Sequence, residues 1–318
     1  MNLMNAELLG MKILVVGAGA IGSYFGVRLI EAGTDVSFLV REKRGEILQT
    51  QGISVTSICG DTHVTNVNTL TEAELLAGNI GYDVVLLAIK SPQLPDILPL
   101  LTQTVQEKTL LISLLNGVHQ KDRLSKHLPT TNICTAIANI IVSEKTIGDI
   151  HHTGVAPHIT LESKQQCSEA LNEKFRLFIN ALTMANIGFS VKTDIERSLW
   201  QKFCFVAPWG VLASSVKLPI GEILVNEKLR SDLNAMIAEY VAIAGAHGVT
   251  LSENAAEKTF AATTKLPANS TTSLQRDLLA GKVGEFDALC QYPFDYSKEN
   301  ELCTPVLNRY YEILSNFS

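Results

Sequence analysis

A lysine stands inside a strongly apolar run in the second half of the chain, where a cation is unusual. Lys202 is the only basic residue between Leu199 and Ala207. On a helix it would share one face with Ser198 and Val206. Such a lysine either extends its ammonium to water and serves the fold alone, or lies partly desolvated at the mouth of a cleft, ready to give up a proton. The second alternative is general acid chemistry.

A glycine pattern with the spacing GxGxxG follows an apolar run near the start of the chain. The motif reads GAGAIG and comprises Gly17, Ala18, Gly19, Ala20, Ile21 and Gly22. Gly17 would allow a tight turn, Gly19 would let a pyrophosphate approach the backbone, and Gly22 would let a helix pack closely. The first amides of that helix would face the phosphates. A turn that only packs is the alternative, but the strand before it and the helix after it favour dinucleotide binding.

An arginine ends the second predicted strand, which spans residues 35–40. Dinucleotide folds that prefer NAD commonly carry an acidic residue near this point, to bind the ribose 2′-hydroxyl. This chain has Arg41 instead, followed by Glu42, Lys43 and Arg44. The planar guanidinium suits a 2′-phosphate, which predicts NADP(H) as the cofactor. A solvated basic turn without a ligand is the alternative.

Two continuous apolar runs, 83–89 and 109–115, are typical of buried parallel strands. They end in Lys90 and Asn116 respectively. In an open parallel sheet, ligands bind beyond the carboxyl ends of the strands. We therefore expect four strands to deliver their following residues to one edge of a sheet: Gly17, Arg41, Lys90 and Asn116.

Further strands are predicted at 133–142 and 158–162, joined by a segment that includes residues 148–154. The adjacent His151 and His152 in that segment suggest a metal site. However, neighbours along a strand point to opposite faces, and no cluster of carboxylates and histidines accompanies them. We therefore expect no metal. An amphipathic helix over 167–185 and a last short strand at 188–191 complete this half.

From residue 193 onward the pattern changes to successive helices. Pro208 is expected to kink or end the helix that carries Lys202. Further helices are predicted at 226–247, 252–265 and 306–314. The sequence thus predicts an α/β Rossmann-type dinucleotide-binding domain over residues 11–191, followed by an all-α C-terminal domain over residues 192–318.

Composition excludes several broad classes of function. The 318 residues include 46% hydrophobic and 18% charged side chains, and the net charge of -6 argues against a general nucleic-acid binder. Six scattered cysteines form no CxxC pair, which favours reduced thiols in the cytoplasm. The first ten residues do not resemble a signal peptide, and no stretch appears able to span a membrane. We expect a cytoplasmic protein without a membrane partner.

Taken together, these motifs resemble the ketopantoate reductases (2-dehydropantoate 2-reductases), which reduce a branched 2-oxo acid with NADPH in the pantothenate pathway. The resemblance extends from about Met11 to the final helix. Besides GAGAIG and Arg41, it rests on LAIKSPQ around Lys90, NGV from Asn116, LWQK ending at Lys202, TSLQRD from Thr272, and Glu285. The family implies a dinucleotide domain, a helical domain, and an active site between them.

The resemblance also implies roles for individual residues. Lys202 matches the lysine that acts as general acid toward the substrate carbonyl, and Glu285 the carboxylate that supports the lysine and the substrate hydroxyl. Ser273 matches a serine that binds the substrate carboxylate. Lys90 and Asn116 match residues that line the nicotinamide and substrate side of the cleft.

Two positions depart from the family pattern on the substrate side. Well-characterised members carry asparagines four and eight residues after the lysine, where this chain has Val206 and Gly210. The substrate pocket is therefore expected to be altered. The leading interpretation is an NADPH-dependent 2-oxo acid reductase, with ketopantoate as the first substrate to test. The alternatives are a related reductase or hydroxyacid dehydrogenase with another small-molecule substrate, and a non-catalytic NADP-binding sensor. No sequence argument decides whether the chain forms a homodimer.

Overall fold

The computed structural model describes residues 10–78, 80–165 and 167–316. Residues 1–9, on which the prediction about a leader depends, lie outside this range. The chain divides into two compact units. Among the described residues, the sheet unit comprises those up to Ile89, Gln93–Leu115 and Lys121–Ile195. The helical unit comprises Lys90–Pro92, Asn116–Gln120 and the described residues from Glu196 onward. Two short segments from the middle of the sequence thus belong to the helical unit.

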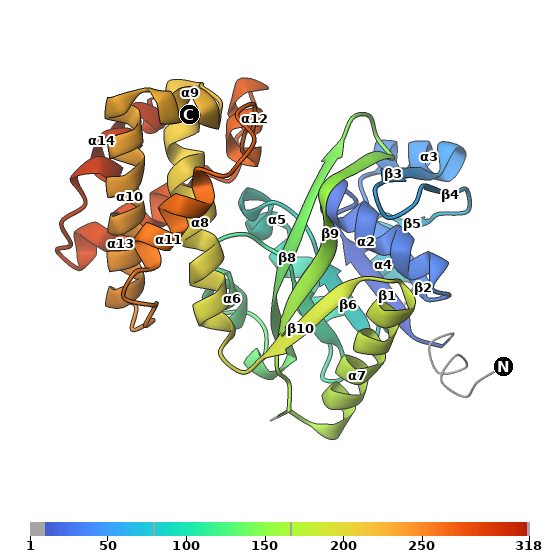
Figure 1. Ribbon diagram of the computed structural model, residues 1–318. Helices are drawn as coiled ribbons and strands as arrows, with labels where there is room; N and C mark the ends of the chain where they lie inside the picture. The colour runs from blue at the N-terminus through green and yellow to red at the C-terminus, as the bar shows by residue number, and fades with distance from the viewer. Residues whose placement is uncertain (1–9, 79, 166, 317–318) are drawn as a thin grey trace. The chain divides into compact units, whose positions relative to one another are not determined.

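The sheet unit is built on one large sheet that is mostly parallel (Figure 1). Its described strands run in the order β4-β3-β9-β8-β7-β6-β1-β2-β5, and β10 pairs with β9. Two pairs are antiparallel, β3 with β4 and β8 with β9. The strands are β1 (Lys12–Val16), β2 (Asp35–Leu39), β3 (Ile53–Ser57), β4 (Thr62–Val64), β5 (Asn68–Leu70), β6 (Val84–Leu87), β7 (Leu110–Ser113), β8 (Ile133–Glu144), β9 (Asp149–Glu162) and β10 (Gly188–Lys192).

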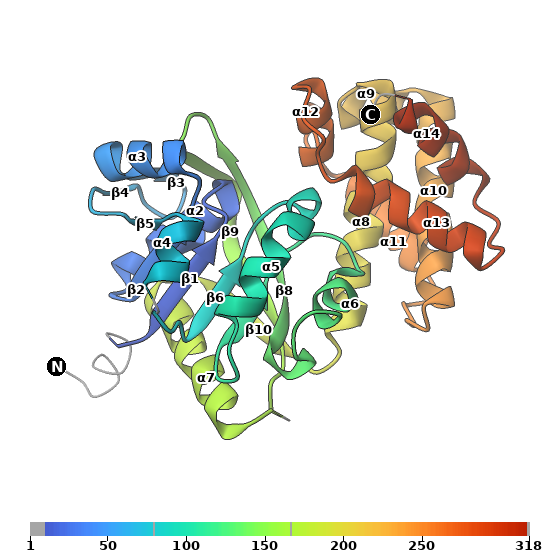
Figure 2. The same cartoon turned by 180° about the vertical axis from the view of Figure 1, so that it is seen from behind.

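Helices connect these strands and cover both faces of the sheet. They are α2 (Ala20–Glu31), α3 (Glu42–Gln51), α4 (Glu72–Ala77), α5 (Leu94–Thr104), α6 (Gln120–Ser125) and α7 (Glu169–Met184), with short 3₁₀ turns η1 (Ser91–Gln93) and η2 (Thr130–Asn132). Helices α2 and α7 lie over one face (Figure 1), and α4 and α5 lie over the other (Figure 2). This is the doubly wound Rossmann-type arrangement that the sequence predicted.

Side chains along β1 point alternately to the two faces of the sheet, and both faces are covered by hydrophobic core. Ile13 and Val15 belong to one hydrophobic core, with Phe178 of α7, whereas Leu14 and Val16 belong to the other. These four side chains are at most 1% exposed. A strand buried on both faces reads as a continuous apolar run, which is the pattern that predicted β1, β6 and β7.

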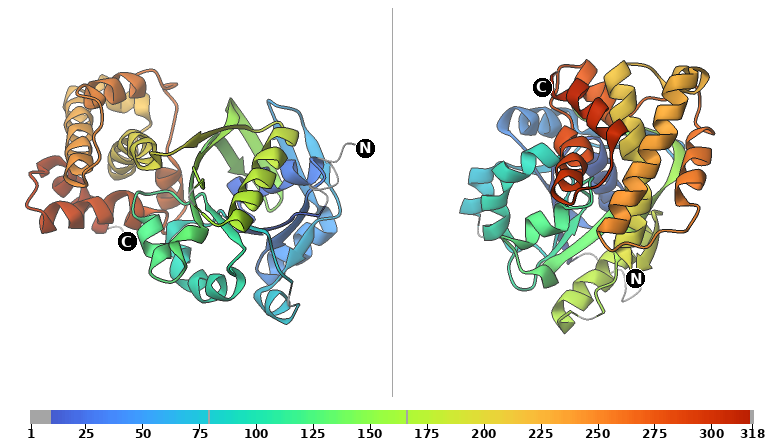
Figure 3. Two further views of the ribbon diagram at one scale, coloured as in Figure 1. Left: turned by 90° about the horizontal axis from the view of Figure 1, so that it is seen from below. Right: turned by 90° about the vertical axis from the view of Figure 1, so that its left-hand side faces the viewer.

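The helical unit packs around α8 (Ile195–Val216) and α10 (Glu227–Ala246). Its remaining described elements are α9 (Ile220–Val225), α11 (Ala255–Thr263), α12 (Ser273–Leu279), a π-helical turn η3 (Asp287–Gln291), α13 (Tyr292–Glu299) and α14 (Pro305–Ser315). Helix α10 contacts α11, α13 and α14 (Figure 3). The core includes Phe203 of α8 and Tyr240 of α10, whose ring centroids lie 5.6 Å apart. No described helix is both long enough and apolar enough to cross a membrane.

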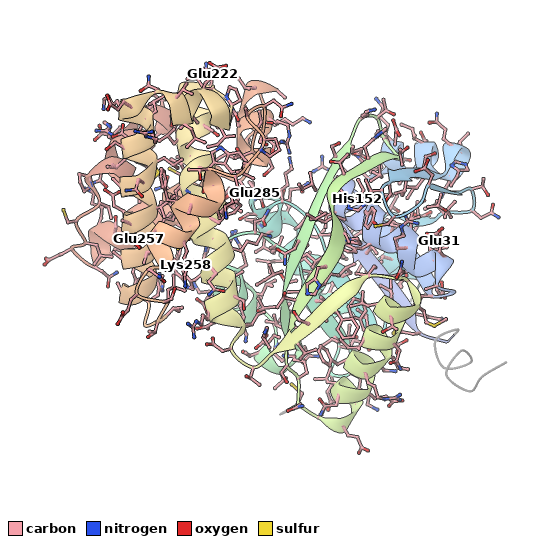
Figure 4. All side chains as sticks on the ribbon, viewed as in Figure 1. Glu31, His152, Glu222, Glu257, Lys258 and Glu285 are labelled. Atoms are coloured by element: carbon pink, nitrogen blue, oxygen red, sulfur yellow. The ribbon has the colours of Figure 1, made fainter. Side chains whose placement is uncertain are left out.

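The strand predicted at 158–162 was too short, because β9 already begins at Asp149. Ile150 pairs with Glu144 of β8 and with Val55 of β3, so tertiary partners on both sides hold a segment whose own residues suggest a connection. His152 is buried beside α2 (Figure 4), and its ring hydrogen-bonds the Ser57 hydroxyl at 2.7 Å. The described residues form no cluster of three or more metal-ligating side chains.

Pro208 was expected to kink or end its helix, and the helix does not end there. Helix α8 runs through Pro208 to Val216. Proline cannot donate a hydrogen bond to the carbonyl four residues earlier, and this normally costs about 3 kcal/mol. Both halves of α8 are nevertheless anchored in one core, by Phe203 before the proline and by Val211 and Leu212 after it. Burial on both sides of the proline accounts for the continuous helix.

Candidate active site

The glycine turn between β1 and α2 has the geometry of a tight dinucleotide-binding turn. Gly17 has a φ of 102°, and a β-carbon there would lie 2.8 Å from the Ala88 carbonyl oxygen. A β-carbon on Gly22 would lie 2.0 Å from the Gly17 carbonyl oxygen, so α2 could not sit this close to the turn with any larger residue. These two glycines are required by the fold itself.

Gly19 differs from the other two, because nothing lies within 4 Å of where its β-carbon would be. Packing therefore does not demand a glycine here, whereas the approach of a ligand does. Gly19 is also the N-cap of α2 and supplies no side chain to bind the first amides of the helix, at Ala20 and Ile21. The open space, the uncapped amides and the helix dipole fit the pyrophosphate of a dinucleotide.

Arg41 and Arg44 have different environments after β2. Arg41 is the N-cap residue of α3 and is exposed, and no ion pair or hydrogen bond of its guanidinium occurs among the described residues. Arg44 instead makes two hydrogen bonds to Glu144, at 2.7 and 2.9 Å, and donates a third to the Ala18 carbonyl at 2.6 Å. Arg41 could therefore bind a phosphate, while Arg44 holds the glycine turn. The sequence shows only a basic strand end and does not reveal this division.

In the helical unit, Asn116 connects two ionisable side chains. The Lys202 ammonium on α8 donates to Asn116 Oδ1 at 3.2 Å, and Asn116 Nδ2 donates to Glu285 Oε2 at 2.8 Å. Glu285 lies on the segment between α12 and η3 (Figure 4). The three predicted residues are thus brought together. The side-chain amide of Asn116 hydrogen-bonds both the lysine and the carboxylate.

Glu285 is 5% exposed. Burial raises the pKa of its carboxyl above the usual range, while the Asn116 hydrogen bond, the Ser91 backbone amide and the positive charges of Lys202 and Lys90 act in the opposite direction. The Ser91 amide donates to Glu285 Oε1 over 3.5 Å. Because donors and cations surround it, the carboxylate has partners that favour its charged form.

The surroundings of Lys202 shift its pKa in the opposite direction from that of Glu285. Desolvation lowers the pKa of its ammonium below the usual range, and the Glu285 carboxylate partly offsets that effect. The side chain as a whole is half-buried, as expected for a lysine on a largely apolar helix face. A lysine whose proton is more readily lost than usual is suited to donate it to a developing oxyanion.

Two other predicted residues, Lys90 and Ser273, have different surroundings. Lys90 contacts both carboxylate oxygens of Asp277 on α12, each at 2.6 Å. Ser273 is the first residue of α12 and is exposed, with Thr272 as the N-cap. No hydrogen bond within the described chain joins Ser273 to Lys202, Asn116 or Glu285.

The two positions where the family carries asparagine follow Lys202 along the same helix. Val206 is half-buried one turn later, and Gly210 is buried two turns later. A β-carbon on Gly210 would lie 3.8 Å from the hydroxyl oxygen of Thr272, which is ordinary van der Waals contact. This wall of α8 therefore offers no side-chain hydrogen bond at either position, and Gly210 faces the residue next to Ser273.

Sequence reasoning missed a set of polar residues behind Glu285. Ser91 and Gln120 are buried at 0% and 4% exposure, and Asp287 accepts a hydrogen bond from the Ser91 hydroxyl at 2.7 Å. Serine, glutamine and aspartate are too common in loops to single out from one sequence. The only available signal was that Ser91 directly follows Lys90 in the motif.

Comparisons with known proteins agree with this arrangement. Residues 13–166 match the family model described as Ketopantoate reductase PanE/ApbA, and residues 194–318 match its C-terminal model. A protein of Bacillus subtilis (strain 168) named uncharacterized oxidoreductase YkpB is 28% identical over 309 residues, or 96% of this chain and 99% of that protein.

Two solved structures share the whole fold. One is 2-dehydropantoate 2-reductase from Geobacter metallireducens GS-15, with a TM-score of 0.86 and 23% identity over 97% of this chain and 100% of that chain. The other is D-mandelate dehydrogenase with NADH and anilino(oxo)acetate, with a TM-score of 0.85 and 18% identity over 96% and 98%. At these identities the likeness establishes the fold.

Proposed function

Because this chain belongs to the ketopantoate reductase family of oxidoreductases, we propose that it reduces a 2-oxo acid to the 2-hydroxy acid with NADPH. The first substrate to test is 2-dehydropantoate, which would yield pantoate. The observation that carries the proposal is the hydrogen-bonded series from Lys202 through Asn116 to Glu285. It joins a proton donor to a buried carboxylate, which a binding protein without turnover does not need.

In the proposed reaction the sheet unit holds the dinucleotide, and the helical unit supplies the groups that act on the substrate carbonyl. Bound NADPH would supply a hydride to the carbonyl carbon. As negative charge develops on the carbonyl oxygen, the Lys202 ammonium stabilises it and then donates its proton. Glu285 keeps the lysine protonated beforehand by favouring its charged form. Asn116 fixes the distance between the two groups.

The preference for NADPH over NADH is a separate part of the proposal. It rests on Arg41, an exposed guanidinium at the end of β2 that no acidic side chain in the described chain engages. Arg44 also supports it, because Arg44 is already paired with Glu144. Arg41 is therefore the guanidinium that we assign to a 2′-phosphate. We also place the reaction in the cytoplasm, where reduced thiols are usual.

The proposal is tested by following NADPH oxidation with a panel of 2-oxo acids. The panel contains 2-dehydropantoate and 2-oxo acids with linear, branched and aromatic side chains. Lys202→Ala is run in parallel, so that turnover by a contaminating reductase is recognised. Turnover of any member that depends on Lys202 supports the reaction class. NADPH binding without turnover of any member would favour the sensor instead.

A second candidate is a reductase of the same class whose 2-oxo acid carries an apolar side chain. Val206 and Gly210 favour it, because both remove an amide from the wall beside Lys202 and Gly210 adds space. The solved D-mandelate dehydrogenase has an aromatic substrate by name and the same fold. In the panel, this candidate predicts faster turnover of 2-oxo acids with aromatic or long aliphatic side chains than of 2-dehydropantoate.

Variants of the same two positions distinguish these candidates. Val206→Asn should shift the preference toward 2-oxo acids with a polar side chain, measured as the ratio of kcat/KM values. Gly210→Ala fits without a clash, and it should selectively slow the bulkiest substrates. If Val206→Asn only unfolds the protein, then Val206 is part of the core, since burying an unpaired amide costs about 1–3 kcal/mol.

A further inference from the structure

Ser91 lies where three separate segments of the helical unit meet. It directly follows Lys90, it is 0% exposed, and its backbone amide donates to Glu285 Oε1. Its hydroxyl donates to Asp287 Oδ2 at 2.7 Å and accepts from Gln120 Nε2 at 3.1 Å. One small side chain thus contacts both the segment that carries Asn116 and the segment that carries Glu285.

Glu285 lies at the start of a helical stretch, where its carbonyl oxygen accepts from the Leu289 amide at 3.0 Å. Gly284, immediately before it, has a φ of 64°, and the chain then enters the π-helical turn η3 at Asp287. Such turns are rare and are often found at functional sites. The π-helical turn runs directly into α13, so contacts that hold Asp287 also set where this helical stretch begins and where the Glu285 carboxylate lies.

We propose that Ser91 is a positioning residue for the reductase reaction. With Gln120, it fixes the segment from Glu285 to Asp287. The Glu285 carboxylate is thereby held in hydrogen-bonding distance of Asn116, which in turn accepts from the Lys202 ammonium. The inference rests on the proposed function for its kinetic consequence, but its structural basis stands on the contacts of Ser91 alone. Ser91 itself contacts no reacting group in this account.

The charge state of Glu285 depends on its position among the charged groups around it. Lys202 faces it from α8 and Lys90 from the loop after β6, while Asp277 of α12 neutralises part of the Lys90 charge. Asp287 lies two residues further along the chain. If the carboxylate moves away from Asn116 and the lysines, its buried charged form loses support. Lys202 then loses the nearby negative charge that keeps it protonated.

The test compares Ser91→Ala with Ser297→Ala, a matched control. Ser297 is also 0% exposed in the helical unit, donates to the Phe294 carbonyl at 2.8 Å and accepts from Thr304 at 3.0 Å. Both variants remove one buried hydroxyl that donates one of the hydrogen bonds given above and accepts the other. Ser91→Ala should lower kcat about 10- to 100-fold, as expected for a misplacement of about 1 Å, and leave the Kd for NADPH unchanged. Ser297→Ala should leave kcat unchanged.

A second measurement does not depend on turnover. In protein labelled with ¹³C at the glutamate carboxyl carbon, the Glu285 signal is assigned by its loss in Glu285→Gln and followed against pH. Ser91→Ala should raise the pKa of Glu285 relative to the wild type, whereas Ser297→Ala should not. If Ser91→Ala does not fold, Gln120→Met removes the donor to the Ser91 hydroxyl and should shift kcat and this pKa in the same directions.

Unchanged titration of Glu285 in Ser91→Ala would overturn the proposal, as would equal kinetic losses in Ser91→Ala and Ser297→Ala. Absence of wild-type turnover on the whole panel would instead count against the proposed function. In that case the carboxyl titration still decides the role of Ser91. The two failures are therefore distinguishable.

Discussion

At Lys202, one ammonium group is subject to two opposing influences, and its substitution is the most direct test of the site. Lys202→Ala should lower turnover about 10²- to 10⁴-fold, the usual range for a positioned acid or base. NADPH binding should be retained, because the glycine turn and Arg41 are untouched. Turnover on the best substrate is measured alongside NADPH titration by fluorescence. Near-normal turnover would identify Lys202 as a structural lysine that takes no part in the reaction.

The matched control for this variant is Lys258→Ala. Lys258 is an exposed lysine on α11, so its removal changes the net charge by the same amount without touching Asn116 or Glu285. It should leave both turnover and NADPH affinity at the wild-type level. A comparable loss in Lys258→Ala would mean that overall charge, and not the position of Lys202, controls the rate.

The pH dependence of kcat should be bell-shaped, with both limbs displaced inward. Burial raises the pKa of Glu285 and lowers the pKa of Lys202. As pH falls through the raised pKa, Glu285 becomes neutral and no longer supports the lysine, so the rate falls. As pH rises through the lowered pKa, Lys202 loses the proton that it must donate, so the rate falls again. The limbs report on the coupled pair.

The variant that isolates the acid limb is Glu285→Gln, measured as kcat against pH on the same substrate. It removes the titrating carboxyl while keeping an oxygen that can accept from Asn116. The acid limb should disappear, and the alkaline limb should move to lower pH because Lys202 loses its negative neighbour. Persistence of the acid limb would assign it to another group and contradict the role given to Glu285.

The same pKa shifts have a consequence for folding stability. A carboxyl with a raised folded pKa is most favourable to the folded state below its unfolded pKa, and that contribution is lost as pH rises through the folded value. An ammonium with a lowered pKa has the opposite sign, and its unfavourable contribution is present below the folded value. Both charged forms therefore oppose folding at neutral pH, as is common where function needs a desolvated site.

Arg41 determines the cofactor preference in the proposal. Arg41→Ala should weaken NADPH binding about 10- to 100-fold, since a hydrogen bond to a charged group contributes roughly 1.5–3 kcal/mol. NADH binding should hardly change. The two affinities are measured by titration, with the exposed Lys126→Ala on the sheet unit as a control for overall charge. Equal losses for both cofactors would remove the assignment of the 2′-phosphate to Arg41.

Individual residues also show what sequence alone could and could not give for the site. Lys202, Asn116 and Glu285 were identified because each falls in a motif that resembles one family. Their roles stay predictions, although their contacts are now described. Ser91 and Gln120 could not be predicted, because what distinguishes them is their proximity to Glu285, which lies more than a hundred residues further along the chain.

At the scale of elements, the turn between β1 and α2 allows a paired test. Gly19→Ala meets open space and keeps an ordinary φ of -83°, so the free energy of unfolding should change by no more than about 0.5 kcal/mol. Gly22→Ala places a β-carbon 2.0 Å from a carbonyl oxygen and should reduce the free energy of unfolding by about 1–3 kcal/mol. Denaturant unfolding of each variant measures this difference.

Dinucleotide affinity completes the comparison of the two glycines. Gly19→Ala should lose NADPH binding while remaining folded, because the added methyl group occupies the space assigned to the pyrophosphate. Retention of full affinity in Gly19→Ala would favour the alternative in which this turn only packs. The pair thus separates the two interpretations of the glycine motif, which its sequence alone left open.

The buried strands were predicted correctly because their own sequence requires burial, whichever elements they pack against. Runs such as 13–16 and 110–112 are apolar throughout and need burial on both faces. The first half of β9 could not be predicted, because polar residues around His151 become a strand only by pairing with β8 and β3. Likewise, Pro208 opposes a helix locally, and the core of the helical unit outweighs it.

For the whole molecule, the two units have separate hydrophobic cores, so we expect each to unfold in its own transition and NADPH at the glycine turn to stabilise the sheet unit. NADPH at a hundred times its Kd should stabilise the state that binds it by about 2.7 kcal/mol. Calorimetry should therefore show one transition moving to higher temperature while a second stays in place. Gly19→Ala should abolish the shift. A single transition that moves as a whole would show that the two cores unfold together.

The division of the chain into units has a consequence for how such proteins can exchange parts. Lys90–Pro92 and Asn116–Gln120 belong to the helical unit, although they are encoded within the sheet unit. Recombination near Glu196 would combine the C-terminal part of one protein with the N-terminal part of another. Ser91, Asn116 and Gln120 would then come from one parent, and Glu285 from the other. Under the proposed function, changes on α8 such as Val206 and Gly210 alter substrate preference. The residues around Glu285, however, come from both parts of the chain and must match one another.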